Sequence, residues 1–210
     1  MTHNLPLATT LALAALAATP LTLSAAPLSN ADFSQGFTAW QGVIDDGAPA
    51  TVAPADYIGN FALSATPGFA TLTNDATYYG VTLFQPFDLS AAGAAGISLS
   101  FDFSWSKTSG LLDGVSASLL DDVGNPLLDL FPAGLDTTLP TNSGSTTADL
   151  SAYAAQSVML AFQLSDGDFN EQDRFTVGSI TLDTGDVPLA PTGALLLAGL
   201  TLLPLVRRRR

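Results

Sequence analysis

Apolar side chains in the middle of this chain recur at every second position. The clearest run is ISLSFDFSWS at positions 97–106, whose large apolar residues are Ile97, Leu99, Phe101, Phe103 and Trp105. The positions between them hold serines and one aspartate. Because successive side chains of a β-strand point to opposite faces of a sheet, the run predicts a strand that buries one face.

Other segments are also rich in strand-forming residues, and short stretches of Gly, Pro, Asn and Asp separate them. They are residues 37–44, 57–66, 69–74, 79–89, 114–120, 157–165 and 173–183. Helix signals are nearly absent between residues 27 and 186, apart from one turn expected within 147–155. Many short strands at such spacings predict an all-β fold, a two-sheet antiparallel jelly-roll sandwich.

Three local features qualify this prediction. Pro86 cannot donate to a ladder, so the strand over 79–89 is expected at an edge or at a bulge. In the last strand, Phe175 and Val177 are out of phase with Ile180 and Leu182, and a bulge at Gly178-Ser179 would return both pairs to the core. The polar stretch PTNSGSTT, at 140–147, is predicted to be a flexible loop.

The chain divides by composition into a segment 1–26, a β-sandwich domain 27–186 and a tail 187–210. All 19 acidic side chains lie in the domain, against only Lys107 and Arg174, so its net charge is −17. Such a domain repels nucleic acid, and none is expected as a partner. The negative charge of the domain favours the binding of cations. The alternative is that its carboxylates form an ordinary solvated surface. With no cysteine, stability must come from the core, with metal as an added source.

The N-terminal segment is uncharged and apolar between residues 5 and 26, with small residues before Pro27. This pattern is typical of a signal peptide, here a signal helix followed by cleavage after Ser24, Ala25 or Ala26. The alternative is an anchor helix that is not cleaved. Either way, the segment predicts export of the domain.

The tail has a proline-containing start, an apolar stretch and four arginines: Arg207, Arg208, Arg209 and Arg210. A helix from Val187 to Val206 would be about 30 Å long, the thickness of one bilayer core. We predict a single membrane-spanning helix with the arginines inside and the acidic domain outside. A plain tail anchor would have the same topology.

The order of motif, apolar helix and arginine cluster resembles the PEP-CTERM sorting signals of Gram-negative bacteria, especially the VPLPA variant. Val187, Pro188 and Leu189 match that box, whereas Ala190 and Pro191 are in swapped order. The resemblance implies recognition by an exosortase-type membrane peptidase. The protein would be tethered to the inner membrane before processing and would then reach the cell surface or the exterior.

A second resemblance competes with the first. LAPTG, at 189–193, is similar to the sorting box of Gram-positive wall proteins, in which a sortase cuts between Thr and Gly. The residues would be Thr192 and Gly193 here. Both interpretations share one physical arrangement, in which a tail held in the membrane presents a sorting motif to an enzyme on the outer side of that membrane.

The acidic stretch DGDFNEQD carries oxygen ligands at nearly alternate positions: Asp166, Asp168, Asn170 and Asp173. Hard cations such as Ca²⁺ bind six to eight such oxygens. The stretch is not an EF-hand, because Glu171 stands where glycine is required and Val177 where a bidentate Glu belongs. The alternative is a polar hairpin loop whose carboxylates face water.

The domain itself resembles bacterial carbohydrate-binding-like jelly rolls. The motifs are NADFSQGFTAWQG at 30–42 and the closing strands over 148–182. The resemblance implies a structural Ca²⁺ between the opening segment and the last strand, at Asp32 and Asp173, with Asn60 nearby. It also implies a polysaccharide partner.

Aromatic rings that could stack on a sugar are those of Trp40, Tyr57, Tyr78 and Tyr79. Each has an alternative role in the core, and Trp105 is in phase with the core. Adjacent Tyr78 and Tyr79 must point in opposite directions in a strand, so one of them at most is available.

The single histidine is His3, and the domain has no cysteine, which excludes a Ser-His-Asp triad, a cysteine nucleophile and a His-based zinc site within it. A glycosidase needs only two carboxylates, but no pair stands out. We therefore expect an exported, non-enzymatic cell-envelope protein. The alternatives are a carbohydrate-binding module and a glycan-acting hydrolase.

Overall fold

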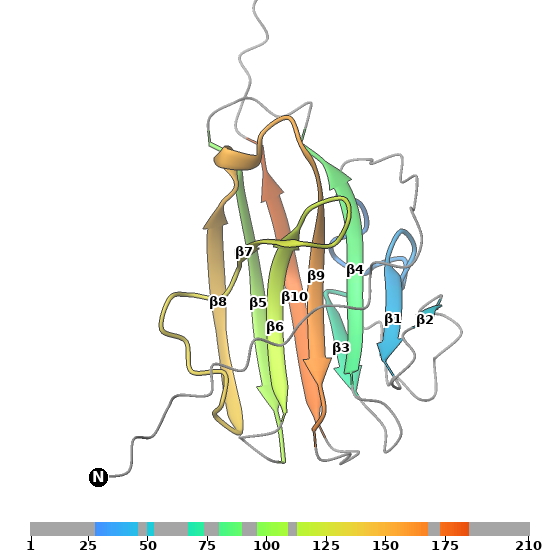
Figure 1. Ribbon diagram of the computed structural model, residues 1–210, viewed down its shortest axis with the longest axis vertical. Coiled ribbons are helices and arrows are strands. Elements are labelled where there is room, and N and C mark those ends of the chain that lie inside the picture. Colours follow the sequence, from blue (N-terminus) through green and yellow to red (C-terminus); the bar gives the residue numbers. More distant parts are fainter. Residues whose placement is uncertain are drawn as a thin grey trace, which may run out of the picture.

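The computed structural model describes residues 28–45, 50–52, 67–73, 80–89, 96–108, 113–167 and 173–184 (Figure 1). The predicted signal segment, the predicted strand 57–66 and the predicted tail lie outside these ranges. Within the described ranges, no helix is long and apolar enough to cross a membrane.

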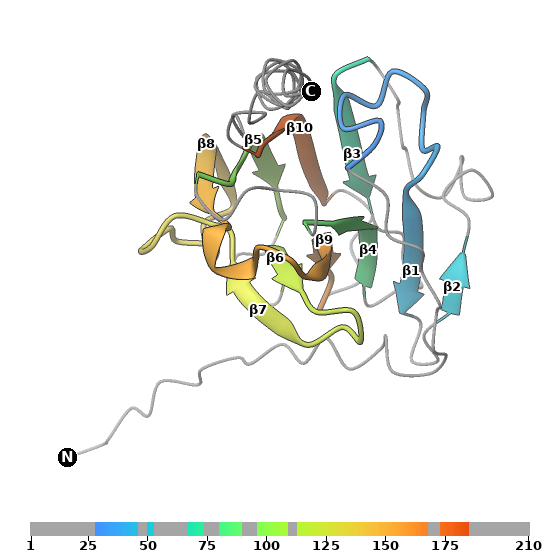
Figure 2. The same cartoon turned by 90° about the horizontal axis from the view of Figure 1, so that it is seen from above.

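The described residues form two antiparallel sheets. The strands are β1 (Gln41–Asp45), β2 (Ala50–Val52), β3 (Phe69–Thr73), β4 (Gly80–Asp88), β5 (Ser98–Ser106), β6 (Gly114–Leu120), β7 (Pro126–Asp129), β8 (Thr141–Asp149), β9 (Ser157–Ser165) and β10 (Arg174–Asp183). One sheet has the order β2-β1-β4-β9-β6-β7 and the other β3-β10-β5-β8. Figure 2 shows the two sheets face to face. The prediction of an all-β fold with two antiparallel sheets is confirmed.

The core lies between the sheets and is filled by the alternating apolar residues that the sequence pattern identifies. Ile97, which directly precedes β5, and the four predicted inward side chains of β5 are buried, as are those of β6 and β9. The ring of Phe162 on β9 lies 5.2 Å from that of Phe101 on β5 and 6.3 Å from that of Phe175 on β10, both edge-on. These edge-to-face contacts connect the two sheets.

The opening segment ties the sheets together without being a strand. The backbone N–H of Ser29 donates to Gln85 Oε1 of β4 at 2.7 Å, and Gln85 Nε2 donates back to Ser29 O at 2.9 Å. The backbone carbonyl of Asp32 accepts from Gly68 N, next to β3 in the other sheet. Directly after these attachments, the Phe33 ring is buried and packs 5.0 Å from that of Trp40.

The predicted bulge in the last strand is confirmed. The register of β10 against β5 shifts between Gly178 and Thr181, and Ser179 has a positive φ of 52°. A Cβ atom at Gly178 would collide with the Phe69 ring and the Gly68 carbonyl. The extra residue therefore restores the phase, so that Val177 and Ile180 both point into the core.

The prediction for Pro86 needs correction, because β4 is neither an edge strand nor bulged at this position. It pairs with β9 from Gly80 to Asp88 without a register shift. Its pairing with β1 ends at Phe84. Among the described strands, β4 therefore has a neighbour on one side only at Pro86, and this local edge accommodates a residue without an N–H.

The prediction of a flexible loop over 140–147 is wrong, because Thr141–Asp149 forms the edge strand β8. The segment lacks an apolar pattern since its inward positions are small: a Cβ atom at Gly144 would lie 3.0 Å from the Phe103 ring. Thr146 is buried and donates through Oγ1 to Leu130 O at 2.9 Å. A large ring on the neighbouring strand thus replaces the apolar side chains that β8 lacks.

Smaller differences concern short elements. The sequence pattern missed β2 and β7, which have three and four residues, and β1 begins at Gln41 rather than at residue 37. The turn expected within 147–155 is confirmed as a 3-10 helix over Ser151–Tyr153. Short strands carry too few alternations to be distinguished from a loop.

We predict that Phe162→Ala lowers the free energy of unfolding by about 3–5 kcal/mol, since a fully buried aromatic side chain is lost and the cavity is only partly refilled. The side chain is 0% exposed, and its ring contacts those of Trp40, Phe101 and Phe175. Urea unfolding followed by tryptophan fluorescence measures the change. Val123→Ala is the control, because Val123 is 63% exposed and should cost less than about 0.5 kcal/mol. Equal losses in the two variants would contradict this account of the core.

Candidate functional site

Three aspartates from three strand ends meet at the lower end of the sandwich in Figure 1. Asp113 directly precedes β6, Asp166 directly follows β9 and Asp173 directly precedes β10. One carboxylate oxygen from each lies within 4.8 Å of the others, and we call this group the aspartate cluster.

Strand pairing explains why the aspartates converge. Gly114 of β6 is the partner of Ser165 of β9, so the residues just beyond them, Asp113 and Asp166, are neighbours. β10 lies in the other sheet, and Asp173 just before it lies close to Asp166 just after β9. The cluster therefore connects the ends of the two sheets.

The side chains of the cluster are almost fully buried, and Asp173 is 0% exposed. Asp173 Oδ1 accepts from the backbone N–H and the hydroxyl of Thr108, at 2.8 and 2.9 Å. Asp113 Oδ1 accepts from Gly167 N at 3.0 Å. Asp173 Oδ2 is buried and has no hydrogen-bond donor among the described residues. A buried oxygen of this kind is costly unless it has a partner.

Lys107 is the buried cation beside the cluster. Its Nζ donates to Asp113 O at 2.7 Å and to Thr137 O at 2.6 Å. Burial lowers the pKa of Lys107, and the negative charges of Asp113, Asp173 and Asp136 oppose that effect. The ammonium thus links the start of β6 to the segment between β7 and β8.

Burial is also the main cause of the shift at Asp173, whose pKa rises to about 6. The two hydrogen bonds from Thr108 lower this pKa, while the neighbouring Asp113 raises it further. The pKa is thus far above the ordinary value of 3.8. The carboxylate form of Asp173 is therefore unfavourable in this environment without a further positive partner.

The cluster matches the predicted Ca²⁺ ligands in part. Asp166 and Asp173 are brought together, and Asn60, Asp168 and Asn170 lie outside the described residues. Asp32 is not in the cluster: its carboxylate lies in an exposed turn and accepts from Ser34. Asp113 is not among the ligands predicted from the sequence. The one feature that marks this residue in the sequence is the Asp-Gly pair at the start of a predicted strand.

The predicted sugar-stacking ring of Trp40 is not available to a ligand. Trp40 is 4% exposed, its ring packs against those of Phe33 and Phe162, and its Nε1 donates to Asn30 O. Trp105 is buried as expected and donates to Leu139 O at 3.0 Å. Tyr57, Tyr78 and Tyr79 lie outside the described residues.

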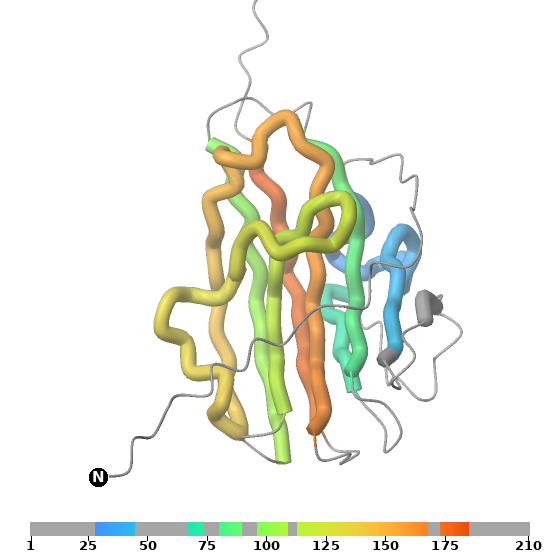
Figure 3. The backbone as a smooth tube through the Cα atoms, viewed as in Figure 1, coloured from blue at the N-terminus to red at the C-terminus, as the bar shows by residue number. Residues whose placement is uncertain are grey.

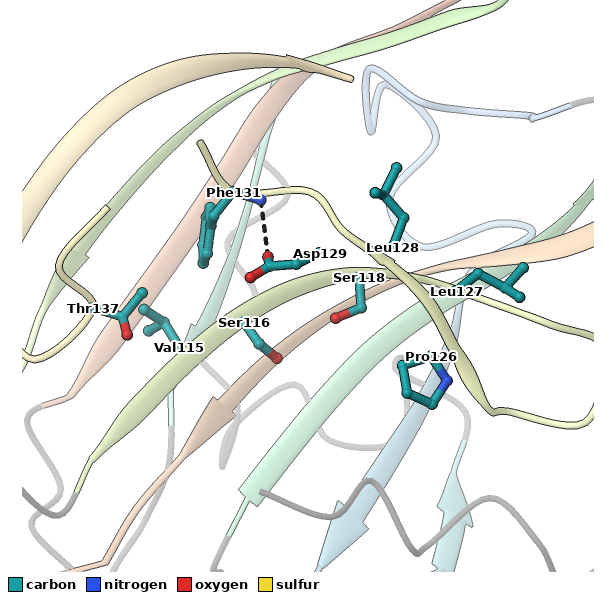
Figure 4. A pocket seen from close by; sticks show the side chains of 9 residues that line it. All are labelled: Val115, Ser116, Ser118, Pro126, Leu127, Leu128, Asp129, Phe131 and Thr137. Carbon is teal, nitrogen blue, oxygen red and sulfur yellow. Dashed lines mark hydrogen bonds between the residues drawn. The ribbon is translucent and has the colours of Figure 1, made fainter. Parts of the chain in front are cut away.

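A pocket of about 320 Å³ lies at the β6–β7 edge of the larger sheet (Figure 4). It is lined by Val115, Ser116, Ser118, Pro126, Leu127, Leu128, Asp129, Phe131 and Thr137. β7 pairs with β6 only from Ser118 to Leu120. The chain then leaves the sheet in the excursion between β7 and β8 that Figure 3 traces, and this departure opens the pocket.

The pocket combines polar and apolar groups. The hydroxyls of Ser116, Ser118 and Thr137 and the carboxylate of Asp129 supply hydrogen-bonding groups, while Leu127, Leu128 and Phe131 supply apolar surface. Asp129 Oδ1 accepts from Phe131 N at 3.0 Å, which fixes the bend where the chain leaves β7. Figure 4 shows this bond.

Comparison with known proteins shows only distant structural likeness. No family model and no curated protein matches the chain. The K3 adhesin domain of Lys-gingipain from Porphyromonas gingivalis is 16% identical, with a TM-score of 0.42, over 73% of this chain and 97% of that one. The N-terminal cellulose-binding domain of β-1,4-glucanase C from Cellulomonas fimi is 16% identical, with a TM-score of 0.37, over 77% and 99%.

A third similar structure is the Stig cyclase Fisc from Fischerella, at 13% identity and a TM-score of 0.38, over 77% of this chain and 98% of that one. An adhesin domain, a cellulose-binding domain and a cyclase differ in function.

The pH dependence of stability tests the environment of Asp173. Because its pKa is higher in the folded chain than in the unfolded chain, its contribution favours folding below about pH 4 and is lost as the pH rises through about 6. In the presence of a chelator, we expect Asp173→Asn to be more stable than the wild type at about pH 7.5, with the difference shrinking toward about pH 4.5. The Asn oxygen can still accept from Thr108.

Unfolding midpoints in urea across this pH range measure the effect. Asp136→Asn is the matched control, since that carboxylate is exposed and hydrogen-bonded to Thr138. Parallel profiles for the wild type and Asp173→Asn would contradict the interpretation.

Proposed function

We propose that this protein is an exported, non-catalytic carbohydrate-binding module of the jelly-roll type. The β6–β7 pocket is the observation that carries the proposal. Ligand pockets combine apolar surface with a few placed polar groups, in volumes of roughly 300–1,000 Å³. The pocket lies at the small end of that range, which suits a short segment or the end of a glycan.

The chemistry of the pocket suits a neutral, hydroxyl-rich ligand. A hydroxyl such as that of Ser116 or Thr137 can both donate and accept, as sugar hydroxyls do. The carboxylate of Asp129 accepts from sugar hydroxyls, and the leucines can cover the C–H faces of a ring. The domain's net charge of −17 disfavours anionic polymers.

The same geometry supports a binding rather than a hydrolytic role. Among the described residues that line the pocket, Asp129 is the one carboxylate, whereas glycoside hydrolysis uses a pair. The carboxylates of the aspartate cluster are buried and cannot reach a polymeric substrate.

We further propose that sorting signals at the two ends of the chain direct the module to the cell envelope. The support is the composition of the apolar segment 5–26 and of the tail, with its box at 187–191 and its arginines at 207–210. An exosortase-type peptidase would process the tail. A sortase acting on LAPTG is the alternative.

Binding of glycans tests the first proposal. On a glycan array, we expect the full chain to retain neutral glycans and to discriminate against sulfated or uronic-acid polymers. Titration calorimetry with the best glycan should then show that Ser116→Ala and Thr137→Val each weaken binding about 2–10-fold, the worth of one neutral hydrogen bond. Ser104→Ala, on the other sheet, is the control and should bind normally. Retention of no glycan, or binding unaffected by both pocket variants, would refute the proposal.

The termini of the mature protein test the second proposal. Mass spectrometry of protein from the producing cell's envelope and medium should find a new N-terminus after residue 24, 25 or 26 and loss of the arginine cluster. A cut at 187–191 indicates the exosortase-type route, and a cut between Thr192 and Gly193 indicates a sortase. Recovery of the intact 210-residue chain from the cytosol would overturn the export proposal.

A further inference from the structure

We infer that Asp113, Asp166 and Asp173 form a site for one divalent hard cation, Ca²⁺ in preference to Mg²⁺ or Zn²⁺, which cross-links the lower ends of the two sheets. The inference is independent of glycan binding, because the site and the pocket are formed by different side chains. It differs from the sequence expectation, in which Asp32 and the opening segment would supply ligands.

The first observation is a buried carboxylate oxygen without a hydrogen-bond donor, on a member of the aspartate cluster. Asp173 is fully buried, and its Oδ2 lacks a donor among the described residues, whereas its Oδ1 is held by Thr108. The Thr108 bonds hold the Asp173 side chain in place, and its carboxylate belongs to the group whose ligand oxygens lie within 4.8 Å of one another. A buried carboxylate oxygen needs a donor or a cation, and a metal bound between the three aspartates would supply it.

The second observation is the balance of charge. Among the described residues, this end of the core brings together three acidic side chains and one basic side chain, that of Lys107, which is a formal charge of −2. One divalent cation would neutralise this charge. Lys107 does not take the place of the cation, because its Nζ is directed to two backbone carbonyls, those of Asp113 and Thr137.

The third observation is the size of the group. The three ligand oxygens lie within 4.8 Å of one another. Ca²⁺ accepts flexible geometries with bonds of about 2.3–2.6 Å, whereas Mg²⁺ demands near-ideal octahedral geometry at about 2.0–2.1 Å. A site made only of carboxylates is less favourable for Zn²⁺, whose protein sites use thiolate and imidazole ligands above all. Ca²⁺ therefore fits with the least movement, and water would complete its coordination.

The position of the site gives it a structural role. Asp113 and Asp166 flank adjacent strands of the larger sheet, and Asp173 directly precedes a central strand of the smaller one. A cation bound by all three would connect the sheets where the chain has no disulfide. Because Lys107 bridges Asp113 and Thr137, the cation would also hold the segment that forms one wall of the pocket.

The experiment is a metal titration of the full chain after treatment with a chelator. Calorimetry with CaCl₂ should show one ion per chain, and thermal unfolding should show a rise of several degrees in Tm with millimolar Ca²⁺ and a smaller rise with Mg²⁺. Asp113→Asn and Asp173→Asn keep the size of the side chain and should each weaken Ca²⁺ binding at least tenfold. Asp121→Asn and Asp136→Asn are matched controls at partly or fully exposed positions and should bind normally.

Folding of the variants is checked separately. Asp173→Asn removes a buried charge, so it should unfold cooperatively in chelator while failing to respond to Ca²⁺. A lack of heat and of any Tm shift in the wild type would overturn the inference. A Ca²⁺ response of equal size in all five proteins would overturn it as well, since that result indicates general screening of the acidic surface.

Discussion

A continuous row of aromatic rings between the two sheets holds this fold together. It runs from Phe33 and Trp40 in the opening segment through Phe162 to Phe101 and Phe175, and on through Phe131 to Phe103 and Trp105. Rings from both sheets and from two irregular segments take part. Buried rings contribute hydrophobic stabilisation and edge-to-face contacts, and here they replace the disulfides that the chain lacks.

The aromatic row also fixes the irregular segments on which the proposed sites depend. Phe131 enters the core between the rings of Phe103 and Phe175, which anchors the chain just after it leaves β7. The indole of Trp105 donates to Leu139 O, which anchors the same excursion at its other end. The pocket wall at Thr137 therefore lies between two attachments to the core.

At the lower end of the sandwich, the buried side chains are charged rather than aromatic. Three carboxylates and Lys107 are buried where strands of both sheets end, and the pKa values of Asp173 and Lys107 are shifted mainly by loss of water. Such a group is costly unless its charges are balanced, so by itself it is not a source of stability. The rest of the described acidic surface needs no such explanation, because exposed carboxylates such as Asp136 are solvated or cap turns.

The sequence alone determined most of the long strands, and it identified the core-facing side chains of those with clear alternation, because alternation is a local property of the chain. It also located the bulge at Gly178-Ser179, since a change of phase is visible without a partner strand. Only the tertiary structure decided which strands are neighbours. It turned the polar stretch 141–149 into a strand beside Phe103, buried Trp40, and placed Asp113 next to Asp166 and Asp173. These outcomes depend on contacts between residues that are distant in sequence, and no local pattern encodes them.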